Sequence, residues 1–291
     1  EQIAKVRKDL ILPKYNQHEP LQGQIHLAHC PERILPGQMV RELVTNDRII
    51  GGMTEACAAK AQQLYDTFVT GTRHLTDCRT AEFVKLVENS YRDVNIAFAN
   101  EVSMICDRIG VDIWAAIELA NRHPRVSILQ PGPGVGGHCI AVDPWFIVDS
   151  APAESRIIRL AREVNHAKTD FVFSQIMHQV QRFSAPVVGV YGLTYKPDVD
   201  DLRESPAVEI VKRLIHETSF RILICEPLVS ALPDSLVSTE NRIRLVTEEE
   251  ARRESDLIAF LVNHRLFGHL KSHMFLNKVV VDAVGLFSGN I

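Results

Sequence analysis

The segment QPGPGVGGHCIAVDP, residues 130–144, surrounds one cysteine with four glycines and three prolines. Gly132, Gly134 and Gly137 fit the G-x-G-x-x-G pattern of dinucleotide-binding loops, in which a helix begins at the last glycine and its free N–H groups face a pyrophosphate. Two prolines interrupt the approach to this pattern, and Pro144 ends any helix soon after it. We therefore do not favour a cofactor-binding loop here.

In a second interpretation the glycines serve Cys139. Without Cβ atoms, Gly136 and Gly137 would let backbone N–H groups and a ligand approach the thiol. Such a loop could stabilise an oxyanion or phosphate beside a nucleophile. A tight turn around an unreactive cysteine is the alternative, and the loop alone does not decide. Asp143 follows Cys139 by four residues, so a helical turn would place a carboxylate beside the thiol.

Two further groups of residues could contribute to a site. Lys85 and Asn89 lie four residues apart and would share one face of a helix, either solvated or pointing into a cleft. The charged segment GLTYKPDVDDLRESPA, residues 192–207, lies between a strand-like and a helix-like run. Ligands bind outside the carboxyl ends of strands in open α/β sheets, although a solvated loop is the simpler expectation.

Composition narrows the function class. The chain has 291 residues, 46% of them hydrophobic, and a net charge of −4 without a long basic run, which argues against nucleic acid or a membrane surface as the main partner. No apolar stretch approaches the roughly 18 residues of a membrane span. The six cysteines and twelve histidines show no metal-ligand spacing. We expect a cytoplasmic protein with free thiols and no metal.

The first 78 residues alternate between strand-like and helix-like runs. The predicted strands are 25–30, 48–52 and 72–78, and the predicted helices are 1–11 and 55–68. An α/β alternation with no strand before its first helix predicts the C-terminal part of a larger α/β domain.

The spacing of the apolar residues changes at about residue 80. Apolar residues recur every three or four positions, at 84, 87, 91, 94, 98, 102, 105 and 109, and no Pro or Gly intervenes before Gly110. This predicts a helix of about 30 residues, roughly 45 Å long. Because so long an apolar stripe must pack along its whole length, we expect a two-subunit interface, with an intrachain bundle as the alternative. Further helices are predicted at 112–122 and 154–182.

The last third of the chain contains near-continuous apolar runs, typical of parallel strands covered on both faces. These runs are 185–193, 220–227, 256–262 and 278–285. A crossover helix is predicted at 204–217. The pattern predicts a Rossmann-like domain.

Four segments together resemble the UDP-glucose/GDP-mannose dehydrogenase family. They are CPERILPG (30–37), AEFVKLVENSYRDVNIAFANE (81–101), GPGVGGHCIAVDP (132–144) and GLTYKPDVDDLRESPA (192–207). The resemblance implies a homodimer that takes a UDP-sugar as substrate and NAD as cofactor, and that oxidises the C6 alcohol to a carboxylate in two hydride transfers.

The resemblance also implies three domains in an α/β fold. Residues 1–78 would be the remnant of an N-terminal NAD-binding Rossmann-like domain. Residues 79–183 would be a central helical domain with a long dimer helix and catalytic residues. Residues 184–291 would be a C-terminal UDP-sugar-binding Rossmann-like domain.

Residue roles follow by the same resemblance. Cys139 would be the nucleophile that captures the aldehyde as a thiohemiacetal and then carries a thioester. Lys85 would stabilise oxyanions and help to deprotonate the alcohol through a water molecule. Asn89 and Asp143 would hold that water and the substrate, and Glu32 would serve thioester hydrolysis.

The binding residues are implied in the same way. Arg125 would enter the substrate pocket of the neighbouring subunit, and Gly136 and Lys196 would contact the sugar nucleotide. Arg203 would lie near NAD. These assignments would let sugar and nicotinamide both reach the thiol.

Two classes of function stay open at this point. Family members carry most NAD contacts on an N-terminal strand–turn–helix that this sequence does not contain. The chain is therefore expected to be either the catalytic and C-terminal portion of a sugar-nucleotide dehydrogenase or a binding or assembly subunit without an NAD site of its own. The complete set of five catalytic residue types favours the first.

Overall fold

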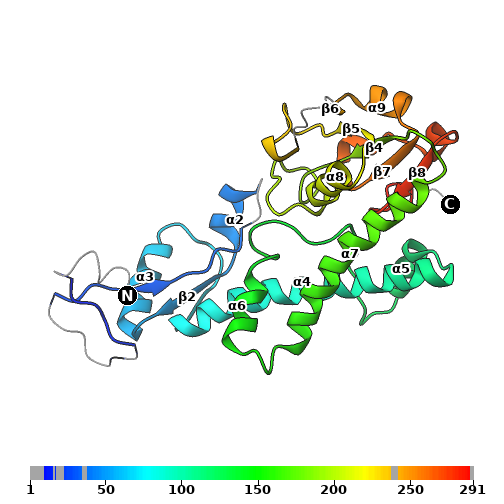
Figure 1. The fold of residues 1–291 in the computed structure, drawn as a ribbon. Helices are drawn as coiled ribbons and strands as arrows, with labels where there is room; N and C mark the ends of the chain where they lie inside the picture. The colour runs from blue at the N-terminus through cyan, green and yellow to red at the C-terminus, as the bar shows by residue number, and fades with distance from the viewer. Residues whose placement is uncertain (1–9, 16, 18–22, 35–37, 237–241, 289–291) are drawn as a thin grey trace. The chain divides into compact units, whose positions relative to one another are not determined.

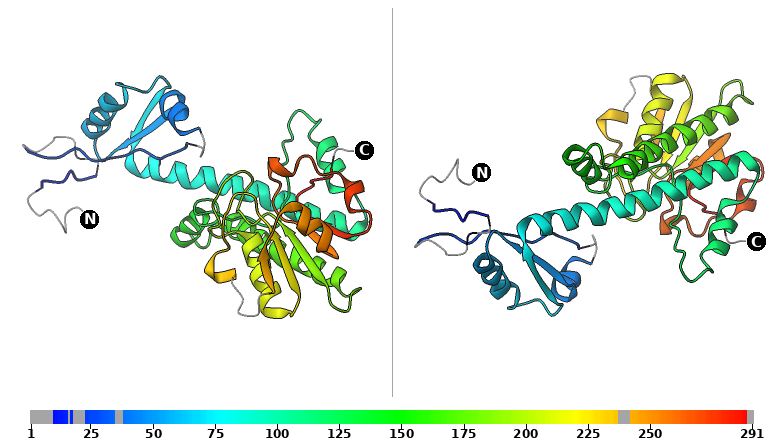
Figure 2. Two further views of the ribbon diagram at one scale, coloured as in Figure 1. Left: turned by 90° about the horizontal axis from the view of Figure 1, so that it is seen from above. Right: turned by 90° about the horizontal axis from the view of Figure 1, so that it is seen from below.

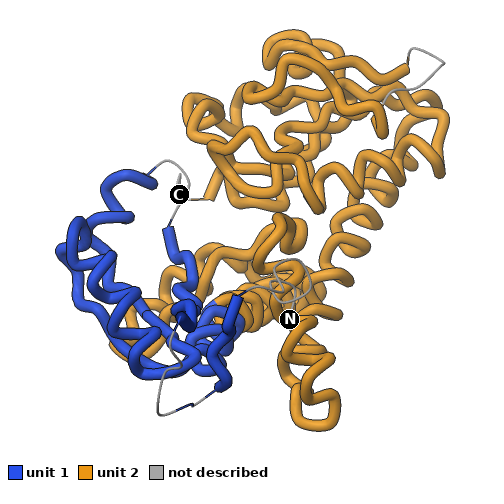
Figure 3. The backbone as a smooth tube through the Cα atoms, turned by 90° about the vertical axis from the view of Figure 1, so that its left-hand side faces the viewer, with its two compact units in different colours: residues 1–88 blue, residues 89–291 orange. Residues whose placement is uncertain are grey.

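The computed structural model describes residues 10–15, 17, 23–34, 38–236 and 242–288. The chain forms two compact units, residues 1–88 and 89–291 (Figure 3). The helix predicted at 1–11 lies outside the described residues over 1–9, as do positions 35–37 of the CPERILPG segment.

The first unit contains a three-stranded sheet in the order β1-β2-β3, with β1 antiparallel and β3 parallel to β2. Its elements are β1 (Ala28–His29), α2 (Met39–Thr45), β2 (Arg48–Gly52), α3 (Glu55–Tyr65) and β3 (Arg73–Asp77). Helix α3 connects the two parallel strands and begins at Thr54, whose side chain accepts a hydrogen bond from the N–H of Cys57. The predictions for 48–52, 55–68 and 72–78 are confirmed, whereas the strand expected at 25–30 shortens to two residues.

Helix α4 (Cys78–Ile109) has 32 residues, which confirms the predicted long helix (Figure 2). It starts where the Asp77 carboxylate accepts hydrogen bonds from the N–H groups of Arg79 and Thr80 and from the Thr80 hydroxyl. It ends before Gly110, whose φ of +73° takes the left-handed conformation that stops a helix.

The two sides of α4 differ in an unexpected way. The predicted apolar stripe is largely exposed: Tyr91 is 68%, Phe98 53% and Ile105 50% accessible. The intrachain bundle is therefore not what covers this stripe. The buried side carries polar residues instead, among them Asp93 and Asn100, which are both fully buried.

Three helices follow, and two of them match the helices predicted at 112–122 and 154–182. They are α5 (Ile113–Ala120), α6 (Asp143–Ser150) and α7 (Arg156–Val180). The Asp112 side chain accepts from the N–H groups of Trp114 and Ala115 and so fixes the start of α5. Helix α7 meets the polar side of α4 through side-chain hydrogen bonds.

A five-stranded, fully parallel sheet completes the second unit (Figure 1). Its strands are β4 (Val187–Tyr191), β5 (Arg221–Cys225), β6 (Ile243–Leu245), β7 (Leu257–Phe260) and β8 (Val279–Asp282). The connecting elements are α8 (Pro206–Glu217), η1 (Asp234–Leu236), α9 (Glu248–Glu254), η2 (Arg265–Phe267) and η3 (Ser272–Phe275). The four predicted strands and the crossover helix are confirmed, and β6 is an additional strand.

The strand order β6-β5-β4-β7-β8 is the 3-2-1-4-5 order of a Rossmann-like sheet. The chain moves from β4 to β5 on one side and returns to β7 on the other, so the direction reverses at the carboxyl end of β4. Segment 192–207 starts at this switch point. Gly192, with φ +89° and no room for a Cβ beside Val262, makes the turn out of β4.

Candidate functional site

The glycine-rich loop is not a dinucleotide fingerprint. Residues 125–130, which precede it, form no strand, and the next helix, α6, begins only at Asp143. The strand–turn–helix on which the fingerprint depends is therefore missing around this loop. The end of the loop does form the predicted helical turn, because the Cys139 carbonyl accepts from the N–H groups of Val142 (3.0 Å) and Asp143 (2.8 Å).

The glycines bring this loop against the segment that follows β4. A Cβ at Gly136 would lie 2.3 Å from the Glu204 carbonyl oxygen, and one at Gly137 would lie 2.8 Å from the Tyr195 ring. The Gly137 N–H also donates to the Arg203 carbonyl at 3.1 Å. The small size of these residues thus serves a contact between two segments of the protein. We had expected it to open a path for ligand, and Gly136 can offer a ligand only its backbone.

Asn89 and Asp143, which the resemblance assigns to one water molecule, are in direct contact. The Asn89 amide nitrogen donates to the Asp143 carboxylate, and Asn89 is 7% exposed. Cys139 lies one turn before Asp143 and is partly buried. An amide and a carboxylate joined in this way can orient a polar group or a water molecule beside the thiol.

Three ionisable side chains gather around the loop. Burial, followed by the charges of Asp201 and Cys139, raises the pKa of Tyr195. The hydrogen bonds that Arg203 donates to Asp201 raise the pKa of Arg203, and Tyr195 and Cys139 add smaller electrostatic effects. Arg203 binds Asp201 through Nε at 3.0 Å and Nη2 at 2.6 Å. Tyr195 and Arg203 therefore lie close to Cys139.

Lys196 lies beside this group. It is partly buried, and its Nζ lies 5.7 Å from the centre of the Tyr195 ring, within reach of a cation–π interaction. The Tyr195 ring in turn faces Gly137. A lysine on this segment and the cysteine of the glycine-rich loop are thus brought to the carboxyl edge of one parallel sheet.

For the three remaining predicted residues the structure gives only their local surroundings. Arg125 is exposed, and its guanidinium makes no hydrogen bond or ion pair with any residue that the structure describes. Lys85 precedes Asn89 by one turn of α4 and belongs to the first unit. Glu32, in the same unit, accepts from the backbone N–H groups of Arg33 (2.6 Å) and Ile34 (2.9 Å). It also pairs with Arg48 at 3.4 Å.

The sequence reasoning missed a buried polar layer beneath the loop. The Arg162 guanidinium donates to the Asp93 carboxylate at 2.7 Å, and Asn165 donates to the same carboxylate at 2.8 Å. Asn100 donates to Asn165 at 2.9 Å and accepts from the N–H of Gly132 at 2.9 Å. Burial raises the pKa of Asp93, and Arg162 opposes that shift. The layer therefore anchors the start of the glycine-rich loop to α4 and α7.

One signal for this layer was present in the sequence. Positions 89, 93, 100 and 103 of α4 share one helical face, and all four are polar. Ser103 accepts a hydrogen bond from Lys168 at 2.8 Å, and burial lowers the pKa of Lys168 to about 8. Thr169 donates to the Pro133 carbonyl at 2.9 Å and adds a second anchor for the loop.

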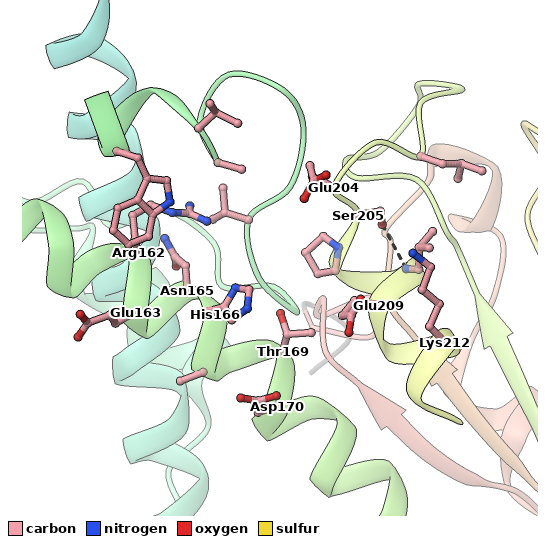
Figure 4. Close-up of a pocket in the computed structure, with 18 residues that line it drawn as sticks. Arg162, Glu163, Asn165, His166, Thr169, Asp170, Glu204, Ser205, Glu209 and Lys212 are labelled. Atoms are coloured by element: carbon pink, nitrogen blue, oxygen red, sulfur yellow. Dashed lines mark hydrogen bonds between the residues drawn. The ribbon is translucent and has the colours of Figure 1, made fainter. Parts of the chain in front are cut away.

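A cavity of about 780 Å³ lies between α7 and the start of α8 (Figure 4). Arg162, His166 and Thr169 line it from α7, and Glu204 and Lys212 line it from the α8 side. Cys139, Lys196 and Arg203 are not among its lining residues. We therefore locate the candidate site by its chemistry at the thiol and not in this cavity.

The described residues offer neither a metal site nor a membrane-spanning helix. No group of three or more His, Cys, Asp or Glu side chains in the described part of the chain could hold a metal ion. None of the helices described has both the length and the apolar character needed to cross a membrane.

The sequence matches three domains of one family. This is the UDP-glucose/GDP-mannose dehydrogenase family. Its central domain matches residues 79–167, its UDP binding domain matches residues 189–289, and its NAD binding domain matches residues 3–69. UDP-N-acetyl-D-mannosamine dehydrogenase of Escherichia coli strain K12 is 47% identical over 99% of this chain and 69% of its own length. The chain belongs to the UDP-glucose/GDP-mannose dehydrogenase family.

Other family members also share a large fraction of their sequence with this chain. NDP-N-acetyl-D-galactosaminuronic acid dehydrogenase of Ralstonia solanacearum is 52% identical over 98% of the chain and 66% of the relative. The UDP-N-acetyl-mannosamine dehydrogenase of Staphylococcus aureus superposes with a TM-score of 0.79 at 41% identity, over 91% of this chain and 62% of that one. The chain thus spans about two thirds of the length of the family members that it matches.

Proposed function

We propose that the protein is the catalytic and sugar-nucleotide-binding portion of an NAD-dependent UDP-sugar 6-dehydrogenase. The observation that carries the proposal is the position of Cys139, one turn from the Asn89–Asp143 pair and on a loop packed against the Tyr195–Lys196 segment. Family membership supports the reaction class, and the match of residues 189–289 to the UDP binding domain supports the substrate class.

UDP-N-acetyl-D-mannosamine is the substrate that we propose. Two similar proteins, from Campylobacter jejuni and Escherichia coli, are named for this sugar nucleotide. The Ralstonia relative is named for an N-acetyl-galactosaminuronic acid, so a second N-acetylated sugar is the competitor to test. The half-buried Lys196 offers a cation for the diphosphate at the carboxyl edge of the sheet.

The chemistry follows from the thiol. Oxidation of the C6 alcohol gives an aldehyde, and the Cys139 sulfur adds to its carbonyl carbon to form a thiohemiacetal, with the proton passing to the carbonyl oxygen. Loss of a hydride and a proton from the thiohemiacetal leaves a thioester. Water then attacks this thioester, releases the carboxylate and restores the thiol. Capture by sulfur keeps the aldehyde from escaping between the two oxidations.

Other residues of the chain support these steps. We assign Lys85 to stabilisation of the developing oxyanions and to deprotonation of the alcohol through water. Asn89 and Asp143 orient that water, and Glu32 assists the water that cleaves the thioester. We assign Gly136 to the sugar through its backbone, and Arg125 to the sugar nucleotide of a neighbouring subunit.

NAD supplies the hydride acceptor for both oxidations when it is bound. The residues present fit this cofactor at one point: the Arg203 side chain is 63% exposed and interacts electrostatically with Cys139. Its Nη1 atom has no hydrogen-bond partner in the described structure, so a cofactor phosphate or amide can bind there. The match of residues 3–69 to the family's NAD binding domain supports the same assignment.

A homodimer in the cytoplasm is part of the proposal. The apolar stripe of α4, which includes Tyr91, Phe98 and Ile105, is exposed among the residues that the structure describes and offers a surface for a partner. A second copy of the helix offers a stripe of the same length and chemistry. The six cysteines are all free, as in a reducing compartment.

Turnover of UDP-N-acetyl-D-mannosamine by the full-length protein, with NAD present, tests this function. Cys139→Ser should reduce formation of the acid by several orders of magnitude while UDP-sugar affinity changes by less than about tenfold, because serine is a far weaker nucleophile near neutral pH. UDP-sugar binding without oxidation in the parent protein would favour a binding or assembly subunit. Near-parental turnover in Cys139→Ser would show that the cysteine is structural.

A further inference from the structure

Three segments meet at the carboxyl edge of the C-terminal sheet, behind the proposed binding segment. Glu226 directly follows β5, Leu193 lies two residues after β4, and His264 lies four residues after β7. These three strands are neighbours in the order β5-β4-β7. Glu226 and His264 have fully buried side chains, which is unusual for ionisable groups.

The Glu226 carboxylate accepts hydrogen bonds from main-chain N–H groups of two loops, two from the segment after β4 and one from the segment after β5. Its Oε2 accepts from the N–H of Leu193 at 2.6 Å and of Thr194 at 3.2 Å, and its Oε1 accepts from the N–H of Leu228 at 3.0 Å. The His264 Nε2 lies 3.1 Å from the same Oε2. Burial by itself would raise the pKa of Glu226, but these hydrogen bonds outweigh it and lower the pKa. Glu226 is therefore ionised and acts only as an acceptor.

These contacts determine which ring nitrogen of His264 carries the hydrogen. The backbone N–H of Asp198 can only donate, and it lies 3.0 Å from Nδ1, so Nδ1 is the acceptor. Nε2 faces the Glu226 carboxylate and carries the hydrogen. His264 is thus a neutral imidazole that joins a carboxylate on one side to a main-chain N–H on the other.

The segment between these contacts carries the proposed binding residue. Glu226 holds it at Leu193 and Thr194, and His264 holds it at Asp198, where a φ of +61° is costly for a residue with a side chain. Tyr195 and Lys196 lie between the two ends. Because the Tyr195 ring packs on Gly137, a shift of the segment moves the surface next to the Cys139 loop.

We propose that His264 is a positioning residue that, together with Glu226, holds the backbone of Leu193–Asp198 so that Tyr195 and Lys196 form the sugar-nucleotide site beside Cys139. The proposal rests on the function proposed above for Lys196. Burial of a carboxylate and an imidazole costs desolvation free energy, and the hydrogen bonds of these side chains, including those to the Leu193–Asp198 backbone, offset that cost. Neither side chain needs to touch the substrate.

Two variants separate the two hydrogen bonds of His264. In His264→Asn the amide oxygen can take the place of Nδ1 and still accept from Asp198. In His264→Gln the amide nitrogen can take the place of Nε2 and still donate to Glu226, but the Asp198 N–H is left unpaired. His269→Gln is the matched control, since that side chain is 60% exposed.

The measurements are UDP affinity by calorimetry and hydrogen exchange of peptides that contain residues 193–198. We expect His264→Asn to bind UDP within about threefold of the parent, and His264→Gln to bind about tenfold more weakly, because one buried N–H loses its partner. Exchange of the loop should accelerate in His264→Gln. The melting temperatures of both variants should fall by similar amounts.

A purely structural role predicts a different pattern, in which UDP affinity follows the melting temperature in both variants alike. That result, or parental UDP affinity and parental loop exchange in His264→Gln, would overturn the proposal. A parent protein that does not bind UDP would contradict the proposed function instead. Loop exchange alone would then decide the positioning role.

Discussion

The two sides of α4 carry the reverse of the usual chemistry for a helix on a soluble domain. The buried side carries polar residues such as Asp93 and Asn100 among small apolar ones such as Ala97, whereas the large apolar side chains of the stripe, such as Tyr91 and Phe98, are exposed. A surface helix of a single globular domain normally buries its apolar stripe. Polar contacts hold the helix within the chain, and the proposed dimer would cover its exposed apolar stripe.

Each side contributes to the site in its own way. The polar side holds the glycine-rich loop, since Asn100 accepts from the Gly132 N–H and Asn165 links it to Asp93. Hydrogen bonds are directional, so this layer specifies one loop position in a way that apolar packing does not. The apolar side is free to bury area against a second subunit. The predictions below treat the two sides separately.

The largest effect is expected on the polar side, at Asp93. Asp93→Ala leaves the buried Arg162 without its carboxylate, so the free energy of unfolding should fall by about 3 to 5 kcal/mol. Urea unfolding at one fixed protein concentration measures it. Glu101→Ala, on the exposed surface of the same helix, is the control and should change the free energy by less than about 0.5 kcal/mol.

A double variant sharpens this test. Asp93→Leu combined with Arg162→Met removes both charges and should recover most of the lost stability, because no unpaired charge remains buried. If Asp93→Ala unfolds like the parent, the polar layer does not hold α4 to α7.

A smaller effect is expected on the apolar side, at Phe98. Phe98→Asp places a charge on the stripe and should weaken self-association at least about 100-fold, close to 3 kcal/mol. Sedimentation velocity over a range of concentrations measures the change. Leu276→Asp, at an 81% exposed position in the C-terminal part of the chain, should leave association unaltered. A parent protein that stays monomeric at micromolar concentration would refute the dimer.

The smallest effect concerns Lys168, at the far end of the polar layer. Burial lowers its pKa from 10.5 to about 8, so the unfolded chain binds more protons than the folded protein between these values. Stability carried by this group therefore rises with pH, by about 1.5 kcal/mol from pH 8 to 9.5. The free energy of unfolding is measured against pH for the parent and for Lys168→Met. The difference between the two curves isolates Lys168, because the other groups titrate in both proteins. Parallel pH curves for the two proteins would contradict the assignment.

Sequence reasoning predicted the long helix and the parallel sheet, since an uninterrupted run of 32 residues and several apolar strands are local signals. It did not find β6, which has only three residues. The family resemblance assigned Asn89 and Asp143 to one water molecule, but the direct contact between their side chains was not predicted.

The rest depended on contacts between distant segments. Asp93 and Asn100 look like solvated residues in the sequence, because charged and amide side chains are usually exposed and their partners lie more than 60 positions away. The same holds for Glu226 and His264, which only the strand order brings together. The glycines were noticed for the right reason, close approach, but the approaching group is the segment after β4.

The most direct test of the proposed function is to trap the thioester on Cys139. The full-length protein, mixed with UDP-N-acetyl-D-mannosamine and NAD and quenched in acid within its first turnovers, is digested and examined by mass spectrometry. We predict a sugar acyl group on the peptide that contains Cys139, increased in Glu32→Gln, and none on the peptide that contains Cys30. Formation of the acid at the normal rate with Cys139 unmodified at every quench time would contradict the account.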